Sequence, residues 1–253
     1  MKTRIKKYLK KVISIINTKK RPEDFDIPSL WIEKILKEDT IFIVQVGSND
    51  GISGDPLYDL IQKNKNWEAL FLEPVPYLFE KLKKNYQNQS RFRFENVAIN
   101  DGTIQTFYSV KDSVKTNIPN LPKWFDQLGS FKRENITKHL NGVLEPYIEE
   151  TNIKGVTLPY ILNANKIKSI DLLHIDAEGY DWVVLSQLDL KYFTPKIILF
   201  EHKHLSPEEK EQSLDFLKKY NYSVIKLGWD YICIKTNSKN LKLLKKLKGV
   251  KVI

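Results

Sequence analysis

The chain has 253 residues and a mass of 29.7 kDa, which suits one large α/β domain or two small ones. Hydrophobic residues make up 42% and charged residues 28% of it, which excludes a disordered polypeptide. Because no apolar run reaches about 18 residues, we expect no transmembrane helix. The single Cys233 excludes an intramolecular disulfide and a cysteine-rich zinc site, and it favours a reducing, cytoplasmic location.

The net charge of +10 is concentrated at the two ends of the chain. Residues 1–21 contain nine Lys and Arg and no acidic residue, and residues 235–253 contain seven Lys and no acidic residue. Residues 22–234 therefore carry 25 basic against 31 acidic residues, a net charge of −6. Nucleic-acid-binding domains carry a basic face instead, so we predict no nucleic-acid partner.

The first 16 residues have the periodicity of an amphipathic helix, with Ile5, Leu9, Val12 and Ile16 on one face and lysines on the other. Such a helix could lie on an anionic membrane. Alternatively, it could pack on its own domain or on a partner. We favour this second interpretation over peripheral membrane contact. Together with a lead-in helix it forms an N-terminal unit, residues 1–38.

Residues 39–235 alternate between apolar runs typical of buried strands and helical segments. Helices are predicted to begin near Asp55-Pro56, at Pro76, before Trp182 and after Ser206, where a capping box occurs. This alternation predicts an α/β fold, a doubly wound Rossmann-like sheet that is mostly parallel with helices on both faces. The predicted strands are Ile41–Val46, Ala69–Leu72, Phe92–Ile99, Leu172–Ile175 and Lys196–Phe200.

The last two predicted strands, Tyr222–Leu227 and Tyr231–Ile234, are separated by only a few residues, Gly228 among them. So short a connection cannot contain a crossover helix, so we predict an antiparallel C-terminal hairpin. The basic tail of residues 236–253 follows it.

One interval is too long for a simple crossover. Between Ile99 and Leu172 lie 72 residues, where a helix and its loops need roughly 20–30. We therefore predict an insertion of about residues 103–165 over the substrate face of the sheet. Its aromatic side chains could line a pocket or simply anchor a long loop: Trp124, Phe125, Phe131 and Tyr147.

The first strand leads into the sequence V-Q-V-G-S-N-D-G, residues 44–51. Its glycines permit a tight turn and a close approach of a ligand, but neither G-x-G-x-x-G nor a phosphate-binding loop is present. Glu73, 22 residues beyond Gly51, ends the second strand, where an acid can accept hydrogen bonds from both ribose hydroxyls of a nucleotide-like cofactor. The combination favours an adenosine-containing cofactor without a pyrophosphate over a surface or capping carboxylate.

Five segments occur in an order that is similar to that of a known family: V-G-S-N-D-G, L-F-L-E-P, N-V-A-I-N-D-G, I-D-A-E-G and I-L-F-E-H. On these segments, residues 40–235 resemble the FkbM family of S-adenosylmethionine-dependent methyltransferases. The chain departs from the common family pattern at Gln45, where Asp is usual, and at His174, where Lys is usual. His174 alternates with apolar residues in a buried strand, so we predict a hydrogen-bonded core residue.

The resemblance implies S-adenosyl-L-methionine as the cofactor and a role for each matching residue. The amino-acid part of the cofactor would be surrounded by four residues of the glycine turn. Glu73 would hold the ribose, Val97 and Ala98 would flank the adenine, and Asp176 would face the site of methyl transfer. The four turn residues are Gly47, Ser48, Asn49 and Gly51.

The family also implies O-methylation of a hydroxyl on a sugar, glycan or glycosylated metabolite. Asp176, Glu178, Glu201 and His202 supply acids and a base at strand ends on the ligand side. Glu178 could instead cap its helix, and His202 could only orient Glu201. Asp176 and Glu201 could also bind a divalent cation, although two carboxylates are too few to assign a metal.

Two other classes of function stay open at this point. One is an NAD-dependent oxidoreductase, which would share the ribose-binding acid but is disfavoured by the missing G-x-G-x-x-G. The other is a non-catalytic module that keeps the fold of a methyltransferase and binds a partner. The intact carboxylates at the strand ends argue against it.

Overall fold

A computed structural model of the chain describes residues 28–37, 40–87, 89–118, 121–122, 125 and 128–237. The predicted N-terminal basic helix and nearly all of the basic tail lie outside these residues, as does Trp124. Within the described part, no helix has the length and apolar character needed to cross a membrane.

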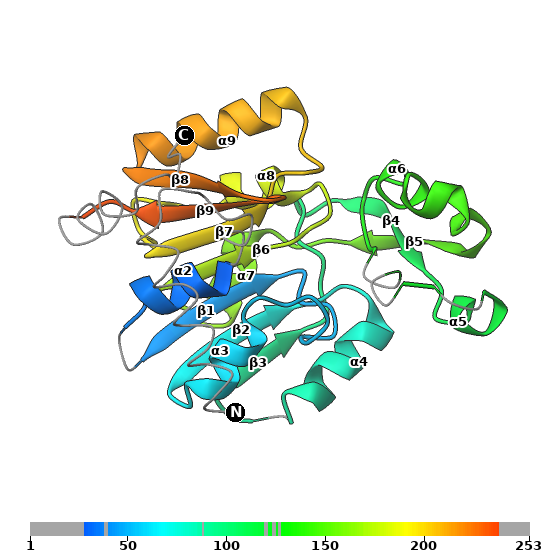
Figure 1. Ribbon diagram of the computed structural model, residues 1–253, viewed down its shortest axis with the longest axis horizontal. Helices are drawn as coiled ribbons and strands as arrows, with labels where there is room; N and C mark the ends of the chain where they lie inside the picture. The colour runs from blue at the N-terminus through cyan, green and yellow to red at the C-terminus, as the bar shows by residue number, and fades with distance from the viewer. Residues whose placement is uncertain are drawn as a thin grey trace, which may run out of the picture.

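The described residues form a seven-stranded sheet in the order β3-β2-β1-β6-β7-β9-β8 (Figure 1). The first five of these strands run parallel, and β9 is antiparallel to both β7 and β8. The predicted Rossmann-like sheet with an antiparallel hairpin at its C-terminal edge is confirmed. The strands are β1 (Ile41–Val46), β2 (Trp67–Leu72), β3 (Phe92–Glu95), β6 (Leu172–Ile175), β7 (Ile197–Glu201), β8 (Tyr222–Leu227) and β9 (Asp230–Lys235).

Helices cover both faces of this sheet because its buried strands are apolar on both sides. In β1, Ile41 and Ile43 pack into the apolar core under α2, α3 and α4, while Val44 and Val46 pack into the core under α7, α8 and α9. The helices are α2 (Pro28–Ile35), α3 (Tyr58–Lys63), α4 (Pro76–Asn85), α7 (Leu158–Ala164), α8 (Asp181–Ser186) and α9 (Pro207–Lys219).

Capping residues and prolines in the sequence mark most helix starts, and the start of α3 is the exception. Ser206 forms the predicted capping box, since its Oγ accepts the N–H of Glu209 at 3.1 Å and the Glu209 carboxylate accepts the N–H of Ser206 at 2.8 Å. The helix predicted from Asp55-Pro56 begins only at Tyr58. Asp55 accepts the N–H of Leu57 at 2.8 Å ahead of that helix.

The third strand is shorter than predicted. β3 ends at Glu95, and the chain then leaves the sheet before Ile99 forms an isolated bridge with Val156. The Asn96 side chain accounts for this change of direction, because its amide donates to the carbonyl oxygens of Glu73 at 2.7 Å and Pro74 at 3.0 Å.

The long interval after β3 contains a second, two-stranded antiparallel sheet of β4 (Ile104–Val110) and β5 (Ile148–Lys154), which the sequence did not predict. Figure 1 shows these strands with α5 (Val114–Asn117) and α6 (Glu134–Thr137) to one side of the main sheet. Two short 3₁₀ helices, η3 (His139–Gly142) and η4 (Glu145–Tyr147), complete the unit. Phe125 is buried in its small apolar core, and Tyr147 packs against that core.

Gly47, directly after β1, permits the ends of β1 and β6 to come together. Its φ is +77°, and a Cβ there would lie 1.8 Å from the Asp176 carbonyl oxygen. The N–H of Asp176 also donates to the carbonyl of Val46 at 2.9 Å. By contrast, a Cβ on Gly102 (φ +86°) would meet, among the described residues, nothing nearer than Thr157 Cγ2 at 3.6 Å.

Gly47→Ala should therefore destabilise the protein more than Gly102→Ala. Both variants force a side chain into the left-handed region, at about 1–2 kcal/mol, but only Gly47→Ala adds an overlap with backbone. Urea unfolding of both variants and the wild type measures the difference. Equal losses of unfolding free energy would show that the strand ends do not approach so closely.

Candidate active site

A cleft opens at the carboxyl ends of β1, β2 and β6, with a volume of about 910 Å³ including its open mouth. The strand order reverses between β1 and β6, and doubly wound sheets bind ligands at such a point. The insertion contributes Phe107, Gly129 and Phe131 to its wall. Its polar and charged lining residues are Gln45, Ser48, Asn49, Ser53, Asp55, Glu73, His174, Asp176, Glu178 and Tyr180.

Glu73 connects the end of β2 to the turn after β1. The residue is 4% exposed, and its two carboxylate oxygens accept the backbone N–H groups of Asn49 at 2.7 Å and Val75 at 2.9 Å. Burial raises the pKa of this carboxyl to about 7, against the effect of those two donors. Each oxygen has two lone pairs, so each retains one for a ligand hydroxyl.

Of the other residues with predicted cofactor contacts, Gly47, Ser48, Asn49, Val97, Ala98 and Asp176 line the cleft, and Gly51 does not. Gly51 has a φ of +74°, and a Cβ there would lie 2.6 Å from side-chain atoms of both Leu82 and Tyr86. Its lack of a side chain thus permits the turn to pack on α4.

Asp176 follows β6 directly and exposes its side chain to the cleft. Desolvation by the surrounding protein raises its pKa to about 6, and the positive charge of Lys203 opposes that rise. Its carboxylate is therefore accessible to a ligand and has a pKa close to neutral pH.

Glu178 lies two residues further on, in a turn with a φ of +45°. Its carbonyl accepts hydrogen bonds from Ser130 Oγ at 2.8 Å and from Asn135 Nδ2 at 2.6 Å. Both donors belong to the insertion, so this turn is where the insertion is attached to the cleft. Desolvation, followed by the negative charges of Asp176 and Glu201, raises the pKa of the Glu178 carboxyl well above its usual range.

The other two predicted catalytic residues lie outside the cleft lining. The Glu201 side chain is 12% exposed, and its Oε2 lies 3.6 Å from Nε2 of His204. His202 is buried, and its ring stacks on Tyr231 at a centroid distance of 4.1 Å. The structure therefore brings Asp176 and Glu178 to the cleft and places Glu201 beside His204.

Two aspartates, the half-buried Asp55 and the buried Asp181, were not predicted as site residues. Asp55 lines the cleft, and burial raises its pKa to about 7. Asp181, fully buried at the start of α8, accepts the N–H of Gly179 at 3.1 Å and that of Glu201 at 3.3 Å. It thereby joins the turn after β6 to the end of β7. For Asp55 the sequence offered only a helix-capping signal.

Gln45 and His174 are neighbours in the β1–β6 register and form part of the cleft lining. His174 is 6% exposed, which agrees with its predicted core position, and burial lowers its pKa to about 4. Its Nδ1, however, makes no hydrogen bond with any described residue. The imidazole is therefore neutral, with a ring nitrogen unpaired.

Comparison with protein-family models gives one match, the methyltransferase FkbM domain, over residues 45–224. The chain belongs to this family. As an FkbM-domain protein it is an S-adenosylmethionine-dependent methyltransferase, and the family resemblance seen in its motifs is confirmed. Comparison with curated proteins gives no match.

Solved structures similar to this FkbM-domain protein include methyltransferases of very different sequence. The chain is 10% identical to precorrin-6y C5,15-methyltransferase of Geobacter metallireducens, with a TM-score of 0.43, covering 87% of this chain and 93% of that one. A fibrillarin pre-rRNA processing protein of Methanococcus jannaschii is 10% identical, with a TM-score of 0.40 and coverages of 79% and 69%. The family assignment rests on the family model.

The cleft suits a cofactor that carries a sulfonium cation. The carboxyl groups of Asp55, Glu73, Asp176 and Glu178 all line it. A cation among them would favour their ionised forms, whose pKa values are otherwise raised by burial. The glycine turn adds backbone that a ligand can approach closely. The residues present therefore fit S-adenosylmethionine.

The buried acids should make the cofactor-free protein less stable as the pH rises. Asp55 and Glu73 have folded-state pKa values of about 7, above the ordinary values of 3.8 and 4.5 for these two groups. Their protons are therefore retained in the folded state and lost from the unfolded one between about pH 4 and 7, so the unfolding free energy falls across that window. Urea unfolding from pH 4 to 8 measures this decline.

Glu73→Gln should make the decline shallower, because it removes one of the titrating groups. Glu80→Gln is the matched control, since the side chain of Glu80 is 69% exposed on α4, and it should keep the wild-type pH dependence. If Glu73→Gln has the same pH dependence as the wild type, Glu73 does not titrate as its burial requires.

Proposed function

We propose that this methyltransferase transfers the methyl group of S-adenosylmethionine to a hydroxyl of a sugar, glycan or glycosylated metabolite. The observation that carries the proposal is the accessible carboxylate of Asp176, with a pKa of about 6, in a cleft that aromatic side chains also line. Methyl transfer to a hydroxyl requires a nearby base, because the oxygen must lose its proton.

The proposed placement of the cofactor follows the cleft lining. Its ribose hydroxyls would donate to the free lone pairs of Glu73, and its adenine would lie against Val97 and Ala98. The amino-acid part would lie against the turn that begins at Gly47, where the backbone is accessible. This placement directs the sulfonium towards Asp176 at the end of β6.

The chain's own groups then perform the proton chemistry. When bound, S-adenosylmethionine would supply an electrophilic methyl group to the acceptor oxygen and would leave as the neutral thioether. Asp176 accepts the hydroxyl proton in the same step, and a pKa of about 6 keeps it mostly ionised at neutral pH. Water in the cleft takes the proton from Asp176 afterwards.

Aromatic side chains support a sugar-like acceptor. Phe107, Phe131 and Tyr180 line the cleft, with centroid distances of 5.2 Å between the two phenylalanines and 4.7 Å between Phe131 and Tyr180. The Tyr180 hydroxyl donates to Gln105 at 2.8 Å, which fixes its ring. Such rings can contact the apolar C–H face of a sugar while leaving its hydroxyls accessible.

The other classes of function receive less support. Membership of a methyltransferase family favours methyl transfer over an NAD-dependent oxidoreductase. An accessible carboxylate beside the glycine turn favours catalysis over a non-catalytic binding module. Acceptor carbon or nitrogen atoms fit the site less well, because an exposed base at this position suits a hydroxyl.

Asp176→Asn should lower kcat by about 10²–10⁴-fold with little change in the acceptor's KM, because it removes the base and retains the shape. The assay measures methylation of a panel of glycosides with isotopically labelled S-adenosylmethionine. The rise of kcat with pH that comes from ionisation of Asp176 should also disappear in this variant. The control is Asp171→Asn, at the opposite end of β6, where Asp171 binds the N–H of Phe42 at 2.9 Å.

Normal turnover in a folded Asp176→Asn protein would remove Asp176 as the base. A second outcome tests the acceptor class separately. If the panel includes amines of matched shape and only these are methylated, hydroxyl transfer is wrong while methyltransferase activity stands.

A further inference from the structure

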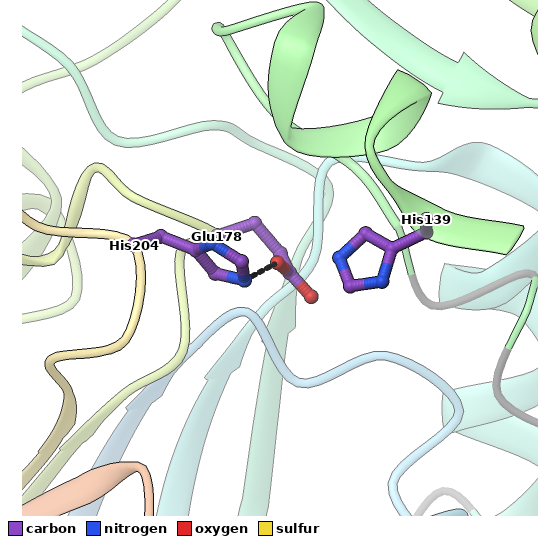
Figure 2. A group of neighbouring side chains, drawn as sticks. All are labelled: His139, Glu178 and His204. Atoms are coloured by element: carbon purple, nitrogen blue, oxygen red, sulfur yellow. Dashed lines mark ion pairs between the residues drawn. The ribbon is translucent and has the colours of Figure 1, made fainter. Parts of the chain in front are cut away.

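His139, Glu178 and His204 converge beside the cleft from three separate parts of the chain (Figure 2). His139 lies in η3 of the insertion, Glu178 in the turn after β6, and His204 in the loop between β7 and α9. Each offers one ligand atom, and these atoms all lie within 4.8 Å of one another. No spacing in the sequence signals the group, because 64 residues lie between its first and last members.

The distances suit a small cation. Nε2 of His204 lies 3.4 Å from Oε2 of Glu178 (Figure 2). Two ligands of a tetrahedral ion with bonds of about 2.1 Å are separated by roughly the same distance. The imidazole rings of His139 and His204 are close neighbours in a T-shaped arrangement, with centroids 5.7 Å apart at an interplanar angle of 71°.

Unpaired carboxylate oxygens give a second, independent observation. Oε2 of Glu178 and Oε2 of Glu201 are both buried, and neither has a hydrogen-bond partner among the described residues. The Glu201 atom lies 3.6 Å from Nε2 of His204, at the edge of the same group. Buried carboxylate oxygens need a donor or a cation, because desolvation without one is costly.

Two lysines whose positive charges act on these acids contact other partners. Nζ of Lys138 donates to Oδ1 of Asn135 at 2.6 Å. Nζ of Lys203 lies over the ring of Trp229, 4.0 Å from its centroid. Both contribute favourable charge at a distance, but neither makes a hydrogen bond or ion pair with Glu178 or Glu201 in the described part of the chain.

We propose that His139, Glu178 and His204 bind one divalent transition-metal ion, best matched by Zn²⁺. Two imidazole nitrogens and one carboxylate oxygen are the donor set of many catalytic zinc sites, which keep a fourth position open. Mg²⁺ prefers oxygen ligands alone, so it matches this set poorly. The group differs from the Asp176–Glu201 pair considered from the sequence, and Glu201 lies at its edge without being one of its three ligands.

The position of the group gives the ion a role. Of the three ligands only Glu178 lines the cleft, so an ion bound to its carboxylate would lie next to the wall that the acceptor would contact. A bound ion there would lower the pKa of a coordinated acceptor hydroxyl and assist its deprotonation by Asp176. This role rests on the proposed O-methylation, whereas binding of the ion does not. The ion would also connect the insertion to the main sheet through His139.

The test is calorimetric titration of chelator-treated protein with Zn²⁺ alone. The wild type should bind one Zn²⁺ per chain, and Zn²⁺ should raise its melting temperature, because the ion binds only the folded site. His139→Gln and His204→Gln should each weaken binding by at least about 100-fold, since removal of a ligand exceeds the 10- to 100-fold effect of an outer partner. His202→Gln is the matched control and should bind like the wild type.

Circular dichroism establishes that each variant is folded, and His139→Gln is the most informative because His139 is a partly exposed residue of the insertion. The proposal is overturned if the wild type binds no Zn²⁺ or if His139→Gln binds it as tightly. It is also overturned if Mg²⁺ binds at the group with equal affinity. If the wild type binds Zn²⁺ as expected but methylates none of the glycosides, only the proposed function is contradicted.

Discussion

The cleft depends on a close backbone contact between the ends of β1 and β6. Gly47 lies so near the Asp176 carbonyl that a Cβ would overlap it. Glu73 joins the end of β2 to the turn after β1 by accepting the N–H of Asn49, and its carboxylate is buried as a result. The cleft lining thus contains one accessible acid, Asp176, and one buried acid, Glu73. In the proposed function the buried acid binds the cofactor and the accessible acid takes the acceptor's proton.

The turn after β6 is the second constraint, because it connects the main sheet to the insertion. The carboxylate of Asp181 holds the turn by accepting the N–H of Gly179. From the insertion, the side chains of Ser130 and Asn135 donate hydrogen bonds to the Glu178 carbonyl. The side chain of Glu178 then faces His204. A movement of the insertion would therefore shift both the aromatic wall of the cleft and the proposed metal ligands. In the proposed function, this turn would couple acceptor recognition to proton chemistry.

The sequence predicted the main sheet well because its strands are buried on both faces and read as short apolar runs. The boundaries of β1, β6 and β8 agree with the prediction. β5 was missed because its sequence, I-E-E-T-N-I-K, is mostly exposed and lacks a regular apolar alternation. The glycine turn and Glu73 were recognisable from spacing, whereas His139 and His204 meet only through the fold. Asp55 was missed because its sequence context is that of a helix cap.

The central claim is that S-adenosylmethionine binds in this cleft through Glu73, and calorimetric titration of Glu73→Ala with the cofactor tests it most directly. Loss of a charge-assisted contact costs roughly 1.5–3 kcal/mol, so the account predicts a Kd weakened about 10- to 150-fold. Glu80→Ala, on the exposed side of α4, should bind like the wild type. Unchanged affinity in a folded Glu73→Ala protein would contradict the account.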